Sequence, residues 1–165
     1  MNVTLVPLSG KDAQYISERI HGWWLEMYSR DISTGTAGLE SIFSREEAPE
    51  HILEHISEGT VYCNLECEGK VVGMAAYKVS AEAFFIDKLY LDSSSRGMGI
   101  GGESLETLID IARSHGCTKV LLHVSPGNKS AYRFYLNHGF VFDYIEEITD
   151  CFGAVGERHH LIRLL

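Results

Sequence analysis

A cluster of four glycines between a strand-like run and a helical pattern constrains this fold most. The apolar run 89–91 ends in a short polar turn, and residues 96–102 (RGMGIGG) follow before apolar residues recur at helical spacing. Glycine lets backbone N–H groups converge because no Cβ atom stands in the way. The first N–H groups of the helix are also unpaired, and its dipole is positive at that end. The stretch therefore predicts an anion cradle suited to phosphate groups.

The spacing of these glycines separates several kinds of phosphate loop. A nucleotide-binding P-loop ends in Gly-Lys followed by Ser or Thr, and no such sequence follows here. Gly97, Gly99 and Gly102 formally fit the dinucleotide motif GxGxxG, but its strand would open a βαβ unit near the chain start, and this strand lies mid-chain. Arg96, Gly99 and Gly101 match a third pattern, [QR]-x-x-G-x-[GA]. A simple glycine turn before a helix is the alternative for this stretch taken alone.

A second motif follows downstream. The pattern N-x-x-A-x-x-F-Y-x-x-x-G-F is matched in full by Asn128, Ala131, Phe134, Tyr135, Gly139 and Phe140. Together the two motifs resemble the signatures of the GNAT superfamily of acetyl-CoA-dependent N-acetyltransferases. With the elements between them they cover residues 83–147, and the N-terminal half resembles the family only in its order of elements. The resemblance implies an enzyme that moves an acetyl group from acetyl-CoA, a cosubstrate, directly to a primary amine without a metal ion.

Hydrophobic periodicity predicts an α/β (α+β) fold, with residues 1–165 forming one domain. Strands are expected at residues 3–8, 61–67, 71–77, 83–91, 120–124, 140–148 and 158–165. Helices are expected around residues 16–27, 44–58, 102–115 and 128–135, and residues 30–44 are expected to form a loop. A strand–helix–strand crossover after an antiparallel meander implies a mixed sheet. The resemblance adds a mostly antiparallel sheet of about seven strands, about four flanking helices and splayed central strands.

The resemblance also implies which residues bind acetyl-CoA. The pantetheine arm lies between two splayed strands in this family, so the backbones of Leu89 and Leu91 are expected to pair with its amides. Asn128 is expected to hydrogen-bond the pantetheine through its side chain, with N-capping of the next helix as the alternative. The pyrophosphate is expected to bind the N–H groups of Arg96, Gly97, Met98, Gly99, Ile100, Gly101 and Gly102.

Tyr135 is the expected general acid, because its motif position implies that role. A thiol has a pKa of ~8.5 and a tyrosine hydroxyl ~10, so proton transfer from Tyr135 to the departing CoA sulfur is feasible. A packing tyrosine on an apolar stripe is the alternative.

The general base is less clear from the sequence. Phe85 occupies the position where some family members carry a glutamate base. Asp87 shares strand parity with Phe85 and Leu89 and is expected to take the amine proton directly or through water. An ion-paired or surface aspartate, or a water chain without a dedicated base, are the alternatives. Weaker candidates are Glu26, His159 and His160.

The acceptor is expected to be a small-molecule amine or a peptide amine. The chain carries 23 acidic and 14 basic residues, a net charge of −9, which opposes nucleic-acid binding. The acidic balance suits a cationic amine, although it also serves solubility. The expected acceptor pocket comprises the first two helices, residues 30–44 and residues 143–158. A homodimer is left open, and a non-catalytic acyl-CoA-binding regulatory domain is the alternative function.

Other patterns bear on location and metal binding. The chain has no run of 18 apolar residues and no secretory signal pattern at its start, so no membrane span and a cytoplasmic location are expected. The four cysteines lack CxxC spacing and are expected to be reduced. His51, Glu54 and His55 match the zinc motif H-x-x-E-H on an expected helix. No third ligand stands out, so this match is interpreted as chance spacing on a polar helix face.

Overall fold

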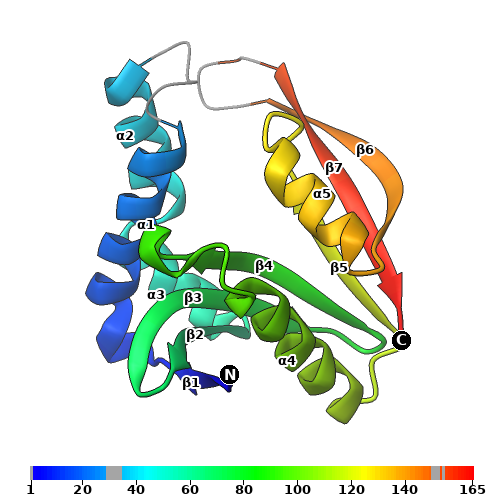
Figure 1. The fold of residues 1–165 in the computed structure, drawn as a ribbon. Helices are drawn as coiled ribbons and strands as arrows, with labels where there is room; N and C mark the ends of the chain where they lie inside the picture. Colours follow the sequence, from blue (N-terminus) through cyan, green and yellow to red (C-terminus); the bar gives the residue numbers. More distant parts are fainter. Residues whose placement is uncertain (1, 29–34, 150–152, 154) are drawn as a thin grey trace.

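Seven strands form a single sheet in the order β1-β2-β3-β4-β5-β7-β6 (Figure 1). The computed structural model describes residues 2–28, 35–149, 153 and 155–165. The strands are β1 Val3–Pro7, β2 Thr60–Cys67, β3 Lys70–Val79, β4 Ala83–Leu91, β5 Lys119–Val124, β6 Val141–Thr149 and β7 Val155–Leu164. Among these described strands β4 and β5 are parallel, and every other neighbouring pair is antiparallel. The expected mixed, mostly antiparallel sheet is confirmed.

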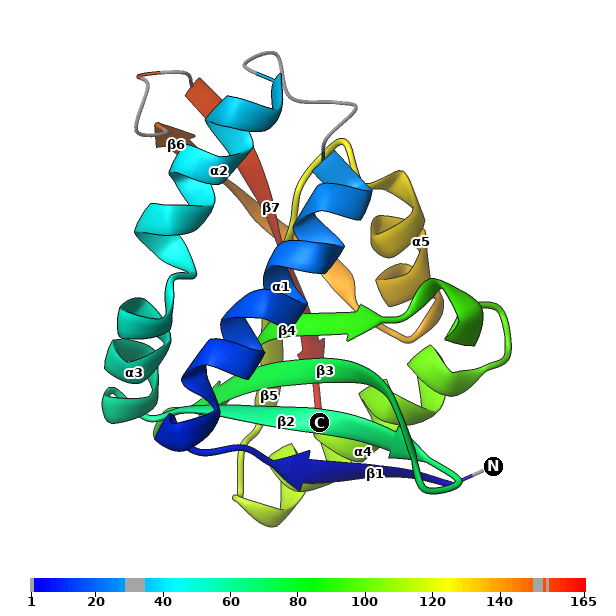
Figure 2. The same ribbon diagram turned by 90° about the vertical axis from the view of Figure 1, so that its left-hand side faces the viewer.

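Five α-helices of the described chain cover both faces of this sheet. They are α1 Ala13–Tyr28, α2 Gly35–Glu46, α3 Pro49–Ser57, α4 Ile100–Ser114 and α5 Lys129–Asn137. The first three lie together on one face (Figure 2). Their core contains Ile16 and Ile20 of α1, and Tyr62 and Met74 of the sheet. Both α4 and α5 belong to the core of the other face.

The expected loop at residues 30–44 is wrong for residues 35–44, which form most of α2; residues 30–34 lie outside the described part. The glycines of this stretch lower its intrinsic helix propensity. Packing against α1 overrides that preference, because the ring of Phe43 lies 4.5 Å from that of His21. His21 Nε2 also lies 2.7 Å from Glu40 Oε1.

The expected start of the second helix at Ser44 is also wrong. Ser44 lies inside α2, where its hydroxyl donates to the carbonyl of Glu40 at 2.8 Å. The next helix, α3, has Ala48 as its N-cap and Pro49 in its first turn. Proline is favoured there because its missing N–H would have no helical partner. The sequence thus contains two helix starts where one was expected.

The sheet opens between β4 and β5. Their register pairs Ala83 with Lys119, Phe84 with Val120 and Phe85 with Leu121. Beyond Phe85, β4 continues beside β3 as far as Leu91, and β5 continues beside β7. The expected splay of the central strands is therefore confirmed, and it leaves backbone groups of β4 facing a gap.

The cysteines and the helix lengths bear on two further expectations from the sequence. Cys63, Cys67 and Cys117 are free and buried, and Cys151 lies outside the described residues. Within the described chain, no helix combines the length and apolar character needed to cross a bilayer.

Close packing at Gly73 of β3 generates the first prediction. A Cβ atom there would collide with the carbonyl oxygen of Tyr90 and lie 2.9 Å from Leu91 Cδ2. We expect Gly73→Ala to lower the free energy of unfolding by about 1–3 kcal/mol, as overpacking does. Gly22→Ala is the control, because a Cβ at this helical position meets nothing within 4 Å. That control should stabilise by about 0.5–1 kcal/mol in urea unfolding; equal effects of the two would contradict the packing shown.

Candidate active site

Two cavities meet at Tyr135. A groove of about 940 Å³ runs along the end of β4, the glycine loop and one side of α5. A second space of about 890 Å³, the side cavity, is enclosed by residues of α1, α2, α3, β4, β5 and β7. Both spaces are lined by Met27, Leu89, Tyr90, Ser125, Asn128, Ala131 and Tyr135. A molecule in the groove can therefore meet a molecule in the side cavity beside the Tyr135 side chain.

The glycine loop presents backbone N–H groups to the groove. Gly97 and Gly99 have φ angles of 75° and 81°, a region that side chains with a Cβ rarely adopt. The helix α4 begins at Ile100, and Glu103 is the residue whose N–H bonds back to Gly99, at 3.2 Å. The N–H groups of residues 100–102 precede that bond and are the orphan donors of this helix end. Such a turn fits a diphosphate.

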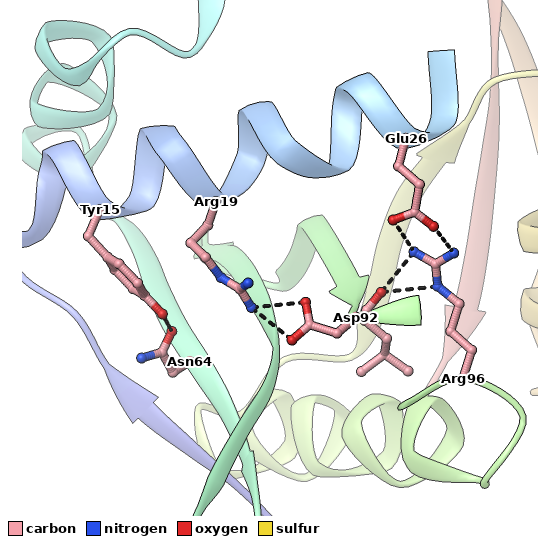
Figure 3. Close-up of polar contacts among 7 residues, drawn as sticks. Tyr15, Arg19, Glu26, Asn64, Asp92 and Arg96 are labelled. Carbon is pink, nitrogen blue, oxygen red and sulfur yellow. Dashed lines mark hydrogen bonds and ion pairs between the residues drawn. The ribbon is translucent and has the colours of Figure 1, made fainter. Parts of the chain in front are cut away.

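The Arg96 side chain turns toward α1 (Figure 3). Its Nε and Nη2 atoms donate to the carbonyl of Leu91 at 3.0 and 2.9 Å. Its Nη1 and Nη2 atoms donate to the carboxylate of Glu26 at 2.6 and 3.2 Å. The Arg96 N–H contacts the carbonyl of Ser93 at 3.4 Å. Glu26, a weaker candidate base in the sequence, is thus held in an ion pair.

The backbones of Leu89 and Leu91 face the gap between the strands. Asp92 N–H donates to the carbonyl of Val72 in β3 at 3.0 Å. Backbone groups of adjacent strand residues point to opposite sides, so the groups of Leu91 and Leu89 point away from β3. The Leu91 carbonyl already accepts two bonds from Arg96, whereas Leu89 borders both cavities. The N–H and carbonyl of Leu89 are the better placed pair for an extended ligand.

Asn128 acts as the N-cap of α5. Its Oδ1 atom accepts the N–H of Ala131 at 3.1 Å, so the capping alternative describes its contact in this structure. The amide nitrogen is a separate donor, and Asn128 borders both the groove and the side cavity. Capping and ligand binding can therefore use different atoms of the same side chain.

Tyr135 lies on α5 with a buried side chain. Its ring centroid lies 5.1 Å from that of Phe134 and 5.6 Å from that of Phe140, both in edge-on arrangements. Burial raises the pKa of the Tyr135 hydroxyl above its ordinary value. The side chain therefore stays protonated at neutral pH.

Side-chain alternation along β4 changes at Asp87. Ile86 lies opposite Tyr77 and Lys88 opposite Ala76, so Asp87 is the extra residue of a β-bulge. Ile86 packs in the core beneath α4, whereas Lys88 reaches Glu47 on the face of α1–α3. The bulge thus moves a charged side chain into the wall of the side cavity.

This bulge corrects the expectation that Phe85, Asp87 and Leu89 share one face. Leu89 packs against the core beneath α4, together with Phe84. Phe85 neighbours Phe84 and therefore points to the opposite face. Phe85 and Asp87 both line the side cavity. The strand parity used to orient Asp87 does not extend across the bulge.

Lys88 joins two carboxylates in the cavity wall. Its Nζ atom lies 2.8 Å from Glu47 Oε1 and 2.7 Å from Asp87 Oδ2. The side chains of Lys88 and Glu47 are only 8% and 6% exposed. Burial alone would lower the pKa of Lys88, but Glu47 and Asp87 outweigh it and raise that pKa. Lys88 is therefore protonated, and Asp87 is ion-paired with it while it also lines the side cavity.

His123 of β5 is a cavity residue that the sequence did not reveal. Its ring lies 5.7 Å from that of Phe85 and 5.7 Å from that of His160. Burial, followed by the charge of Arg158, lowers the pKa of His123 to about 4. The imidazole is therefore neutral at pH 7. The sequence shows only a histidine within an apolar strand. Its place in the cavity wall follows from the position of β5 beside the gap in the sheet.

The weaker histidine candidates lie away from both cavities. His160 bonds to Glu146 Oε2 at 2.8 Å and stacks on Tyr144, and His159 lies 3.5 Å from Glu157 Oε2. Neither His159 nor His160 lines the groove or the side cavity.

The zinc-like pattern on α3 is not assembled as a metal site. His55 Nδ1 lies 3.1 Å from the hydroxyl of Tyr62, and His51 and Glu54 line the side cavity. In the described part of the chain, no three His, Cys, Asp or Glu side chains gather as metal ligands.

The buried ion pair generates the second prediction. Lys88→Met would leave the Glu47 carboxylate buried without its cation, so we expect a loss of about 3–5 kcal/mol in unfolding free energy. The double variant Glu47→Leu/Lys88→Met removes both charges and should recover most of that loss. Urea unfolding of the parent and the three variants, including Glu47→Leu alone, measures the coupling. Additive losses in the double variant would contradict the pairing.

Comparisons with known proteins agree with this architecture. The chain is similar, with a TM-score of 0.79 and 20% identity over 100% of both chains, to the PaiA N-acetyltransferase from Thermoplasma acidophilum in complex with coenzyme A. It is also similar to a GCN5-related N-acetyltransferase from Rhodopseudomonas palustris, with a TM-score of 0.77 and 18% identity over 100% of this chain and 97% of the other. A putative acetyltransferase from Salmonella typhimurium with acetyl-CoA gives a TM-score of 0.65 and 19% identity over 100% and 95% of the chains.

No curated protein sequence matches the chain. The family model for the acetyltransferase (GNAT) family matches residues 18–140, which include the glycine loop, Asn128 and Tyr135. Because that match covers most of the chain, the protein belongs to the GNAT acetyltransferase family and is an acyltransferase that uses acetyl-CoA.

Proposed function

We propose that this protein is an N-acetyltransferase that moves the acetyl group of acetyl-CoA directly to a primary amine held in the side cavity. The observation that carries this proposal is the meeting of the groove and the side cavity at Tyr135. Donor and acceptor can then be bound at the same time and in contact, which favours direct transfer.

The groove offers acetyl-CoA three sets of contacts. The N–H groups between Gly97 and Gly102 suit the pyrophosphate. The Leu89 backbone suits the amides of the pantetheine arm, in the manner of an added strand. The Asn128 amide nitrogen borders the same path. The Leu91 carbonyl and the Arg96 guanidinium bind each other in this structure, so we assign them to loop support rather than to direct contact with the cofactor.

Tyr135 supplies the proton for the leaving group. The amine nitrogen forms a bond to the thioester carbonyl carbon, the carbon–sulfur bond breaks, and the sulfur receives the Tyr135 proton. Burial raises the pKa of Tyr135, so the tyrosinate left by this transfer takes a proton back from water in the open cavity before the next turnover. General acid help of this kind is worth about 10²–10⁴-fold.

Asp87 is the proposed acceptor of the amine proton, through a water molecule. Its carboxylate borders the side cavity and is about one-third exposed, while Lys88 holds it in position. The side cavity is open to solvent beside Asp87, so the proton can pass onward to water.

The side cavity favours a small acceptor with a cationic amine. Its volume of about 890 Å³ falls in the range of small-molecule sites. Five carboxylates line it (Glu46, Glu47, Glu54, Asp87 and Glu157), and so do four basic side chains (Arg45, Lys78, Lys88 and Arg158). Lys88 is paired with Glu47 and Asp87, so Glu46, Glu54 and Glu157 are the carboxylates that we assign to an ammonium group. An acceptor screen that measures free CoA thiol tests this function, with polyamines, amino acids and peptide amines as classes. Acetyl-CoA binding without thiol release by any class would favour a non-catalytic acyl-CoA-binding domain.

The acid role of Tyr135 gives the third prediction. We expect Tyr135→Phe to lower turnover about 10²–10⁴-fold, because the ring remains and only the proton donor is lost. Affinity for CoA should stay within about twofold, a change that corresponds to less than ~0.5 kcal/mol. Turnover is measured by thiol release and affinity by calorimetry. Equal turnover of variant and parent would remove Tyr135 from the acid role.

The proton acceptor gives the fourth prediction. We expect Asp87→Asn to lower kcat/KM at pH 7 by at least tenfold and to lose less activity as pH rises, because free amine then forms without a base. His123→Gln is the comparison, since its pKa of about 4 keeps His123 neutral throughout pH 6–9. Its profile should keep the shape of the parent's. A flat effect of Asp87→Asn across pH would indicate a structural role instead.

A further inference from the structure

Arg96 lies between two acceptors that come from separate parts of the fold. One is the Leu91 carbonyl at the end of β4, and the other is the Glu26 carboxylate on α1 (Figure 3). Its guanidinium makes two contacts with each acceptor, all between 2.6 and 3.2 Å. The fork of donors in arginine suits such paired contacts, which a lysine ammonium cannot reproduce.

These bonds close the turn that leads into the glycine loop. Leu91 and Arg96 flank the 3₁₀ turn Ser93–Ser95, and the side-chain bond of Arg96 joins the two ends of that turn. The glycines that follow have no side chains of their own to restrain them. The loop N–H groups are therefore oriented from two ends: Arg96 holds the entry to the loop, and the buried Ile100 side chain holds the start of α4.

Glu26 supplies the second anchor of Arg96, in addition to the Leu91 carbonyl. An unpaired arginine side chain samples many rotamers, and ordering them on ligand binding costs affinity. Glu26 restricts that choice before the ligand arrives. The two side chains are 42% and 45% exposed, so an ion pair between them contributes little to overall stability. Their contribution should appear in ligand affinity rather than in unfolding.

The helix that carries Glu26 also forms part of the acceptor site. Met27 lines both the groove and the side cavity, and Trp24 lines the side cavity. Two turns before Glu26 on the same helix, Arg19 contacts both oxygens of Asp92 at 3.0 and 3.1 Å (Figure 3). The helix α1 is thus bonded at two points to the segment that leads into the glycine loop.

We propose that Glu26 is a positioning residue for acetyl-CoA, which acts through Arg96 to preorganise the glycine loop and to couple that loop to the acceptor wall on α1. This inference rests on the proposed function, because it assigns the groove to acetyl-CoA. Glu26 makes no contact with the reacting atoms in this role. It replaces the earlier interpretation of Glu26 as a weak candidate base.

Glu26→Gln tests the proposal. We expect the Kd for CoA, measured by calorimetry, to rise roughly fivefold to tenfold, at the lower end of measured coupling between sites. The melting temperature of the free protein should fall by no more than about 2 °C, as for an exposed ion pair. Glu18→Gln is the matched control: it makes the same change of charge on the same helix, where Glu18 accepts a hydrogen bond from Gln14 and lies away from the glycine loop. Its Kd should equal that of the parent.

A double-mutant cycle separates positioning from a general loss of charge. Arg96→Lys keeps the positive charge but loses the paired contacts, so it should weaken CoA binding to a similar extent. The double variant Glu26→Gln/Arg96→Lys should be no weaker than Arg96→Lys alone, because both changes break one connection. In the parent, CoA should also slow amide hydrogen exchange in residues 20–27 of α1, and this slowing should shrink in Glu26→Gln.

Three results would overturn the proposal. A Kd for Glu26→Gln equal to that of the parent would show that the ion pair does not organise the loop. Tighter binding by Glu26→Gln would show that Glu26 keeps Arg96 away from the phosphates. Failure of the parent itself to bind CoA would reject the assignment of the groove, and with it the proposed function; this outcome is distinguished from the first two by the parent measurement alone.

Discussion

The parting of β4 and β5 beyond Phe85 is the constraint on which the site depends. Each strand keeps its antiparallel partner on the outer side, β3 for one and β7 for the other, so the sheet opens without losing those ladders. The inner backbone groups of β4 then lack a strand partner and face the groove. One of them, the Leu91 carbonyl, is satisfied by Arg96, and Leu89 borders the space where an extended ligand can lie.

A single extra residue at the bulge changes the chemistry of the same strand. If β4 alternated regularly across Asp87, each residue after it would point to the face opposite to the one that it occupies in this structure. The shift instead buries Lys88 beside Glu47 in the wall of the side cavity. Removing two charges from water is costly, and this buried ion pair lies in the wall of the side cavity, not within the apolar core. Local departures from regular structure of this kind concentrate at functional sites.

The helix α1 connects the two halves of the site. Its apolar face packs on the sheet through Ile16 and Ile20, which is a structural role. Its other contacts, Arg19 with Asp92 and Glu26 with Arg96, join it to the segment around the glycine loop. The wall of the side cavity and the glycine loop are therefore joined through one packed helix.

The sequence by itself determined the family, most elements and the glycine turn before α4, because these depend on local patterns: periodicity for β4 and α4, glycine spacing at 97–102, and the motif around Tyr135. It missed α2, since packing of Phe43 on α1 outweighs the low helix propensity of its glycines. Only the tertiary structure decided the contacts of Lys88, His123 and Glu26. Lys88 pairs with Glu47, 41 residues earlier in the chain, and Glu26 pairs with Arg96, 70 residues later. Neither a bulge nor an ion pair between such distant segments produces a periodic pattern in the sequence.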